Sequence, residues 1–327
     1  MKITMAHGSG GKLTSDLIAE VFESSYGNEV LSSMEDSAVV LGHENIAVTT
    51  DSFVVSPMFF KGGNIGRLAI CGTVNDLLMR GAVPKYITSA FIIEEGADTE
   101  TLKKIALSMA ETAREAGVIV VAGDTKVIEG KGDIFINTTG VGFADNLNIR
   151  SKNVKAGDRV IVSGNIGDHH ATILSSRMGI ENTIKSDNAP LNEMVLNLLN
   201  GNIKISAMRD VTRGGLGTIL NEIAVASGTE INIDEASIPV DPQVKSFAKF
   251  LGLEIMHMGN EGKMIAVVDE KDADTALQII KNSKYGENAQ IIGTVKSADE
   301  PCVTLNTAIG GKRKIPVLRG EGLPRIC

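Results

Sequence analysis

The sequence predicts an α/β (α+β) protein built from two domains. Three observations carry this prediction. The length of 327 residues is ordinary for two domains, and strand-like and helix-like segments follow one another through both halves of the chain. A polar, turn-rich stretch at 150–157 separates the two halves. We therefore expect one domain at 1–150, a second at 151–316, and a C-terminal segment at 317–327.

Hydrophobic periodicity predicts the elements of the first domain. The segment 99–116 is a clearly amphipathic helix, and Gly117 marks its end because glycine readily takes the left-handed conformation of a helix C-terminus. The other expected helices are 13–22 and 65–79. The expected strands are 38–41, 46–50, 86–93, 118–122 and 134–143.

The second domain repeats this mixture of strands and helices. Its expected strands are 159–163, 230–233, 264–268, 291–295 and 303–305. Its expected helices are 171–178, 191–199, 217–226 and 244–251. The final segment 317–327 holds Gly320, Gly322 and Pro324 and has no periodicity, which predicts an extended, flexible tail.

Composition excludes several classes of function. The net charge of −8 disfavours binding to nucleic acid or to an anionic membrane surface. No apolar run approaches the roughly 20 residues that span a bilayer, and the N-terminus has no signal-peptide pattern. Three cysteines without CxxC spacing are too few for a disulfide framework or a zinc site. We expect a reduced, cytoplasmic protein.

Acidic residues stand at five predicted element ends, four of them directly beside glycine, serine, threonine or asparagine and the fifth in the run Arg-Asp-Val-Thr-Arg-Gly-Gly at 209–215. Mg²⁺ prefers oxygen ligands and keeps waters and substrate phosphates in its coordination shell. Any one of these residues alone is more simply a turn or helix cap. The five together predict a metal–nucleotide site. They are Asp36, Asp51, Asp76 with its neighbour Asn75, Asp124 with its neighbour Thr125, and Asp210.

The segment 7–12, His-Gly-Ser-Gly-Gly-Lys, could cradle phosphate with free backbone N–H groups and a lysine. It is not a Walker A motif, because Ala6 and Leu13 stand where glycine and Ser or Thr belong. A flexible surface loop is an equally good interpretation. The candidate phosphate-binding residues are Gly10, Gly11 and Lys12.

Arg213 precedes a predicted helix, where the cation and the free helix amides could hold an anion; simple capping by Thr212 is the alternative. Glu261 precedes the strand 264–268 and is either a general base or a solvated turn residue. The terminal Cys327 is either a carrier thiol or incidental. The pair His169–His170 could bind metal, but a surface pair is the simpler interpretation.

Together these motifs resemble the ATP-binding superfamily of aminoimidazole ribonucleotide synthetase and selenophosphate synthetase, and the resemblance runs from end to end. The ending Pro-Arg-Ile-Cys at 324–327 resembles one branch, the carbamoyl dehydratases that mature nickel-iron hydrogenases; the sister enzymes lack it. The motifs that carry the resemblance lie at 7–12, 36–38, 49–52, 72–77, 123–127 and 209–215.

The resemblance implies a fold and a site. The N-terminal domain would hold a mixed sheet that pairs across a homodimer as a barrel, and the C-terminal domain would be an α/β sandwich. Asp210 matches a metal-binding position of sister enzymes, and Lys126 and Glu261 match polar residues near the docked cysteine. The positions that match the family's Mg-ATP carboxylates are Asp36, Asp51, Asp76 and Asp124.

The resemblance also implies a reaction and partners. The carbamoyltransferase HypF would place a carbamoyl group on Cys327, and ATP would phosphorylate the amide oxygen. Loss of the amide proton and of phosphate would leave an S-cyanated cysteine, whose cyanide would pass to iron on the HypC–HypD complex. Glu261 would take the proton, while Lys126 and Mg²⁺ would neutralise negative charge. The alternatives are another ATP-dependent synthetase or small-molecule kinase, and a non-catalytic scaffold.

Overall fold

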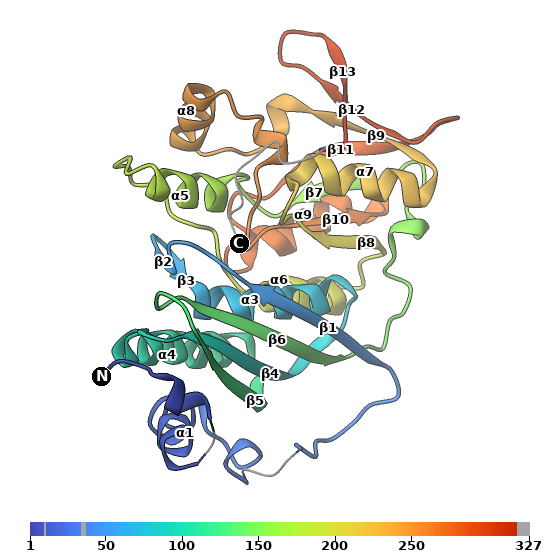
Figure 1. Cartoon of the computed structure of the whole chain (residues 1–327). Helices are drawn as coiled ribbons and strands as arrows, with labels where there is room; N and C mark the ends of the chain where they lie inside the picture. The colour runs from blue at the N-terminus through green and yellow to red at the C-terminus, as the bar shows by residue number, and fades with distance from the viewer. Residues whose placement is uncertain (10, 34–36, 319–327) are drawn as a thin grey trace.

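The computed structural model describes residues 1–9, 11–33 and 37–318 (Figure 1). Two sheets organise the chain, a four-stranded sheet in the N-terminal half and a seven-stranded sheet in the C-terminal half. The α/β class predicted from the sequence is therefore confirmed. Within the described ranges, every helix is too short or too polar to cross a lipid bilayer.

The smaller sheet has the strand order β1-β6-β4-β5, and only β4 and β5 run parallel. Along β6, buried and half-exposed residues alternate, because helices cover one face of the sheet and the other face is open. We refer to these as the covered face and the open face. The four strands are β1 (Ile46–Phe53), β4 (Val83–Glu94), β5 (Ile119–Ile128) and β6 (Ile134–Phe143).

Two long helices, α3 (Ile65–Met79) and α4 (Thr99–Ala116), pack on the covered face. Asn64 begins α3 by accepting N–H groups from the first turn, and Asp98 does the same for α4. Gly117 ends α4 in the left-handed conformation, as predicted.

The N-terminal segment forms a run of helical turns that packs beside α4. α1 (Lys12–Leu17) continues through a π-helical turn at Ile18–Glu23 into α2 (Ser24–Tyr26). Phe22 is buried, and its ring centroid lies 4.6 Å from that of Phe91 on the covered face. A short hairpin of β2 (Phe59–Phe60) and β3 (Gly63–Asn64) precedes α3.

The larger sheet has the order β13-β12-β9-β11-β7-β10-β8, in which only β9 and β12 run parallel. All five residues of β10 are buried, as expected for a strand with both faces covered. The strands are β7 (Arg159–Val162), β8 (Ile205–Asp210), β9 (Thr229–Asp234), β10 (Met264–Val268), β11 (Gln290–Ser297), β12 (Cys302–Asn306) and β13 (Lys312–Ile315).

Helices cover both faces of this sheet. α7 (Gly215–Ser227) packs into the core on one face, and α6 (Asn192–Asn200) and α9 (Ala273–Asn282) share the core on the other. That second core is continuous with the one beneath α3 and α4, so α3 joins the two halves. A separate cluster joins α5 (Asp168–Arg177) and α8 (Pro242–Leu251).

Most predicted elements are present, and the helices 65–79 and 99–116 and the strands 134–143 and 264–268 have the predicted bounds. The predicted strand 38–41 is wrong: Val39 and Leu41 are 89% and 82% exposed, and the segment pairs with no strand among the described residues. The sequence analysis did not identify β8, α9 or β13. Residues 319–327 of the predicted tail lie outside the described residues.

Candidate active site

Asp51 and Asp76 lie close together on the covered side of β1. Thr50 and Ser52 point to the open face, so the strand alternation turns Asp51 towards α3. A methyl group at Gly72 on α3 would lie 3.8 Å from the Asp51 carboxylate. One helical turn further, the Asp76 carboxylate accepts a hydrogen bond of 2.8 Å from the Thr49 hydroxyl.

Two further carboxyl groups reach this place from the other half of the chain. Asp210 ends β8, which contacts α3 directly. Glu261 lies in the loop before β10 and is only 5% exposed, so the alternative of a solvated turn residue is excluded. Asp51, Asp76, Asp210 and Glu261 together are called the acid cluster below.

Burial and mutual repulsion raise the pKa values in the acid cluster. Burial, with the charge of Asp76 added, raises the pKa of Asp51 to about 6. Burial and then the charges of Asp76 and Asp51 raise the pKa of Asp210 to about 7. Burial, Asp187 and Asp210 raise the pKa of Glu261 well above its usual range. The cluster therefore favours binding of a cation or of protons.

Arg213 is an exposed cation close enough to affect three of the four carboxyl groups of the acid cluster. Its charge lowers the pKa of Asp51, Asp76 and Glu261 against the effect of burial. The helix that follows has Gly214, not Thr212, at its N-cap, and no side chain caps it. The alternative role of Thr212 as a side-chain cap is therefore wrong, and Arg213 remains available to hold an anion beside the carboxylates.

A second polar group stands on the open face. The Lys126 ammonium lies 2.6 Å from an Asp124 carboxylate oxygen, and this hydrogen bond lowers the pKa of Asp124. Asp124 belongs to β5 and Asp51 to β1, three strand spacings away, or roughly 14 Å. Within a single copy of the protein, Asp124 and Lys126 therefore lie too far away to belong to the acid cluster.

The start of the glycine-rich segment at 7–12 packs along β5. A methyl group at Gly8 would lie 2.6 Å from the Val127 backbone nitrogen, so only glycine fits there. Gly11 has φ +77° and begins α1, which again requires glycine. Lys12 pairs with Asp16 one turn along its own helix, at 2.7 Å. Gly8 is thus held against the strand that carries Lys126.

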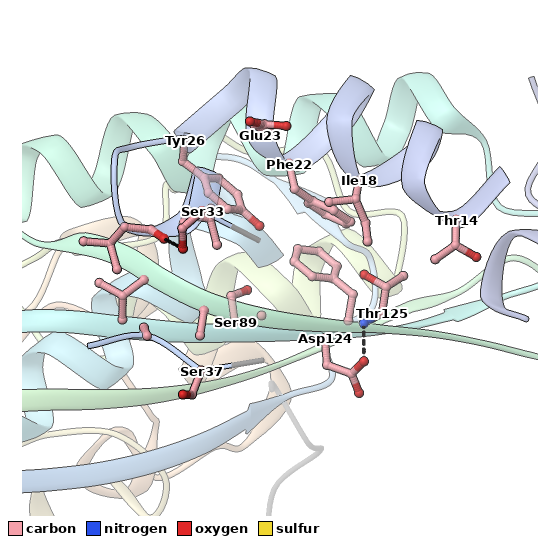
Figure 2. Close-up of a pocket in the computed structure, with 17 residues that line it drawn as sticks. Thr14, Ile18, Phe22, Glu23, Tyr26, Ser33, Ser37, Ser89, Asp124 and Thr125 are labelled. Carbon is pink, nitrogen blue, oxygen red and sulfur yellow. Dashed lines mark hydrogen bonds between the residues drawn. The ribbon is translucent and has the colours of Figure 1, made fainter. Parts of the chain in front are cut away.

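A cavity of about 240 Å³ lies between the N-terminal helices and the covered face (Figure 2). Figure 2 shows Ile18, Phe22 and Tyr26 pointing from the helices towards the strands, with Thr125 on the same side. The Asp124 carboxylate points to the other side of the strand. An apolar cavity with a few polar groups at its edge suits a planar aromatic ring such as a nucleotide base.

Asn75 has a structural role in this geometry. Its side chain is 3% exposed, donates a hydrogen bond of 3.0 Å to the Ala189 carbonyl and accepts one of 2.9 Å from the Leu191 N–H. Both ends of the amide are therefore used to fix the segment 189–191 to α3. Contact between this side chain and a nucleotide stays a prediction.

The segment before Ala189 positions Glu261. The Asp187 carboxylate accepts the N–H groups of Glu261 and Gly262, at 3.3 Å and 3.1 Å. Lys263 lies 4.0 Å from the same carboxylate. The sequence analysis missed Asp187, because its partners are backbone groups distant in sequence and no local motif reports them.

Oxygen-rich chemistry of the acid cluster fits Mg²⁺, which usually takes one or two carboxylates and completes its shell with phosphates and water. Among the described residues, no three His, Cys, Asp or Glu side chains form a ready metal site. Asp36, Gly10 and Cys327 lie outside the described residues. His169 and His170 are buried on α5, at 0% and 3% exposed, so the interpretation as a surface pair is wrong.

Comparison with known proteins identifies the family. Residues 34–144 match the N-terminal domain and residues 155–306 the C-terminal domain of AIR synthase related protein. A carbamoyl dehydratase HypE from Rhizobium leguminosarum bv. viciae is 45% identical over 333 residues, covering 100% of this chain and 95% of the relative. The chain belongs to the HypE family of carbamoyl dehydratases. The HypE of Escherichia coli K12 is 41% identical, with 99% of each chain covered.

Solved structures of the HypE family agree in fold. A HypE in complex with ATP has a TM-score of 0.96 and 41% identity, with 99% of each chain covered. HypE from a HypE–HypF complex has a TM-score of 0.81 and 48% identity, covering 92% of this chain and 99% of that one. The predicted resemblance to hydrogenase-maturation carbamoyl dehydratases and the AIR synthase-like α/β fold are therefore confirmed.

Proposed function

We propose that this chain converts a carbamoyl group on the sulfur of Cys327 into a nitrile, using ATP. The amide oxygen attacks the γ-phosphorus of ATP, and the bond to ADP breaks. Phosphorylation of the oxygen gives an iminophosphate, C(=NH)–O–P, and releases one amide proton. The C–O bond of this iminophosphate then breaks, so the oxygen leaves within phosphate and the second amide proton is released. The product is an S-cyanated cysteine, the source of the cyanide ligand of nickel-iron hydrogenase.

The buried acid cluster is the observation that carries this proposal. Dehydration of an amide needs a base for the nitrogen protons and a site for phosphate. Glu261 is buried and its pKa is raised, which suits a general base that works near neutral pH. Arg213 would hold the phosphate oxygens, and Gly11 and Lys12 would contribute to nucleotide binding.

Asp51, Asp76 and Asp210 would hold Mg²⁺, together with Asp36. When bound, the ion neutralises charge on the phosphates of ATP. Asp124 as a further ligand, and Lys126 to stabilise negative charge on the transferring group, would have to come from a second copy of the chain. Thr125 and Asn75 complete the proposed nucleotide-binding set.

A homodimer through the open face is part of the proposal. The row Val48, Val141, Tyr86 and Ile119 crosses all four strands of that face. Val48 is 64% exposed in the single chain and Ile119 is 41% exposed. Apolar sheet faces of this kind are normally buried. A second copy there would also cover Asp124 and Lys126.

We propose HypF as the donor of the carbamoyl group and the HypC–HypD complex as the acceptor of cyanide. A relative crystallised as a HypE–HypF complex supports the first of these partners. A cytoplasmic location fits the need for a reduced thiol at Cys327. The division into domains 1–150 and 151–316 with a carrier segment at 317–327 stays a prediction.

Intact-mass spectrometry tests the reaction. The chain is first carbamoylated by a HypF enzyme and carbamoyl phosphate, then incubated with Mg-ATP. We expect the mass to fall by one water, with phosphate released in equal amount and the change located at Cys327. Cys327→Ala is the control and should take up no carbamoyl group. An unchanged mass with ATP hydrolysed, or loss of water from another residue, would contradict the proposal.

A further inference from the structure

The proposed carrier segment 317–327 begins just after β13. Ile315 ends this strand, and its side chain packs into the core beside α7 with 2% of its surface exposed. Pro316 has no N–H group and cannot continue the ladder. Beyond it the chain runs at the surface, where Val317 is 45% exposed. The positions of Ile315 and Pro316 therefore set where the carrier segment starts.

Two buried side chains hold the carbonyl groups of these two residues. The Asn221 amide on α7 donates a hydrogen bond of 3.0 Å to the Ile315 carbonyl oxygen. The Nε2 atom of His257 lies 3.1 Å from the Pro316 carbonyl oxygen. Because a carbonyl oxygen only accepts, Nε2 carries the hydrogen and donates it. Asn221 and His257, which are 8% and 7% exposed, are called the root clamp below.

Two glycines of α7 make room for the root clamp. A methyl group at Gly217 would lie 3.0 Å from His257 Nε2 and 3.1 Å from the Ile315 side chain. Gly215 has φ +63°, and a methyl group there would lie 2.6 Å from the His257 carbonyl carbon. Both glycines belong to the run Thr-Arg-Gly-Gly-Leu-Gly at 212–217. This close packing seats His257 against the helix and leaves its ring little room to turn.

His257 also begins the loop that carries the proposed base. Glu261 lies four residues further along the chain, at most roughly 14 Å away between Cα atoms. Between them, the Asn260 side chain fixes the loop. Its amide donates a hydrogen bond of 2.8 Å to the Val211 carbonyl and accepts one of 2.7 Å from the Gly167 N–H. The root clamp and the base therefore share one loop that is held at several points.

The length of the carrier segment suits this distance. Eleven residues separate Pro316 from Cys327. A chain of that length spans about 36 Å when extended, and a flexible one has a root-mean-square span of about 17–20 Å. The second value is on the same scale as the distance from the root clamp to the base. The local concentration of a tethered group is highest when the two match.

We infer that His257 and Asn221 are positioning residues for the dehydration: they fix the start of the carrier segment beside the Glu261 loop and so raise the local concentration of the S-carbamoyl group there. This inference rests on the proposed function. β13 is an edge strand with three of its four residues exposed, so it depends on the root clamp. Release of the chain back to the end of β12 at Asn306 nearly doubles the tether, which lowers the local concentration about threefold.

Single-turnover mass spectrometry in two arrangements tests the inference. In cis, the full chain carries the S-carbamoyl group on its own Cys327 and is mixed with Mg-ATP. In trans, a synthetic peptide of residues 317–327 with the same group is given to the Cys327→Ala chain. His257→Phe keeps a ring but has no donor, and it should slow the cis reaction about threefold or more. In trans, kcat/KM for the peptide should stay or rise, because the loosened segment competes less for the site. Equal slowing of both reactions, or an unchanged cis rate, would overturn the inference.

Three further variants sharpen the comparison. His257→Gln keeps an N–H donor and should recover part of the cis rate that His257→Phe loses. Asn221→Ala, on a helix that accepts alanine readily, should reproduce the slowing in cis alone and serves if His257→Phe folds poorly. Asn197→Ala on α6 is the matched control, because it removes a single hydrogen bond of 3.0 Å to Ser283, and it should leave both rates unchanged.

Hydrogen exchange of β13 tests the root clamp without the reaction. The amides of β13 should exchange at least about tenfold faster in His257→Phe than in the Asn197→Ala control. Unchanged exchange would show that these hydrogen bonds do not hold the strand, and would refute the inference while leaving the proposed function intact. A wild-type chain that loses no water in cis would instead refute the proposed function, whatever the exchange shows.

Discussion

The Asp187 carboxylate holds the backbone of Glu261, accepting its N–H at 3.3 Å. The same carboxylate accepts the N–H of Gly262 and lies 4.0 Å from the Lys263 ammonium. Position 262, between Glu261 and Lys263, must be glycine, because a methyl group on Gly262 would lie 1.9 Å from the Asp187 carbonyl oxygen. The proposed base is thus fixed by a segment that has no part in the reaction.

Glu261→Gln should reduce dehydration of the carbamoylated chain by about 10²–10⁴-fold, because the isosteric amide cannot take a proton. ATP affinity should stay within a few fold. Single-turnover mass spectrometry and a nucleotide-binding titration check the two parts. Glu129→Gln, an exposed residue in the β5–β6 turn, is the matched control. Full activity in Glu261→Gln would assign the proton transfer to another group.

Asp187→Asn should shift the pH dependence of the reaction. The charge of Asp187 is, after burial, the largest cause that raises the pKa of Glu261. A base is active when deprotonated, so activity is lost as pH falls through its pKa. Removing the charge lowers that pKa, and the acid limb of the kcat profile should move to lower pH by about one unit. A profile identical to that of an Asp299→Asn control would contradict this electrostatic coupling.

The nucleotide-free protein should lose stability as pH rises from about 5 to 8. The folded-state pKa of Asp210 is raised to about 7, above its usual value, so the folded chain binds more protons than the unfolded chain across this window. Asp210→Asn removes the ionisation and should increase the free energy of unfolding at pH 8 by roughly 1–3 kcal/mol. Urea unfolding at pH 5.5 and 8 measures this. If Asp210→Asn changed the free energy of unfolding equally at pH 5.5 and at pH 8, this prediction would be wrong.

Val48→Lys should convert the proposed dimer into a monomer, because it places a charge within the apolar row of the open face. Val225→Lys is a close control: Val225 is 65% exposed on α7, and Val48 is 64% exposed on β1. Sedimentation velocity should show a dimer for the wild type and the control. A Val48→Lys protein that still sediments as a dimer would place the interface elsewhere.

Asn75→Ala should destabilise the fold by roughly 2–4 kcal/mol, since it leaves the Ala189 carbonyl and the Leu191 N–H unpaired in the interior. Asn75→Asp keeps an acceptor for the Leu191 N–H and should lower the free energy of unfolding by less. ATP affinity measured below the unfolding transition should also fall in Asn75→Ala, because Asn75 belongs to the proposed nucleotide-binding set. Lost stability with unchanged affinity would restrict Asn75 to its structural role.

Local signals in the sequence predicted much of the fold. α4 was identifiable because its apolar face and its Gly117 end agree with each other. The segment 38–41 has an apolar run like that of a buried strand, but only the three-dimensional structure shows that Val39 and Leu41 face solvent. α9 and β13 escaped notice because their shorter patterns are ambiguous without their partners.

The site was partly predictable for a similar reason. Asp51, Asp76 and Asp210 stand beside residues that local rules single out, and the structure brings them together. That Asp124 belongs to the other face of the sheet follows from strand register, which a single sequence does not specify. Asp187 acts on backbone N–H groups, and its role emerges only once the loops are in contact.

Because Asp187 accepts the N–H groups of Glu261 and Gly262, the loop before β10 is tied to the stretch 187–191. Asn75 ties the same stretch to α3, the helix that also carries Asp76. A substitution that loosens this stretch should therefore displace a carboxyl group that it never touches.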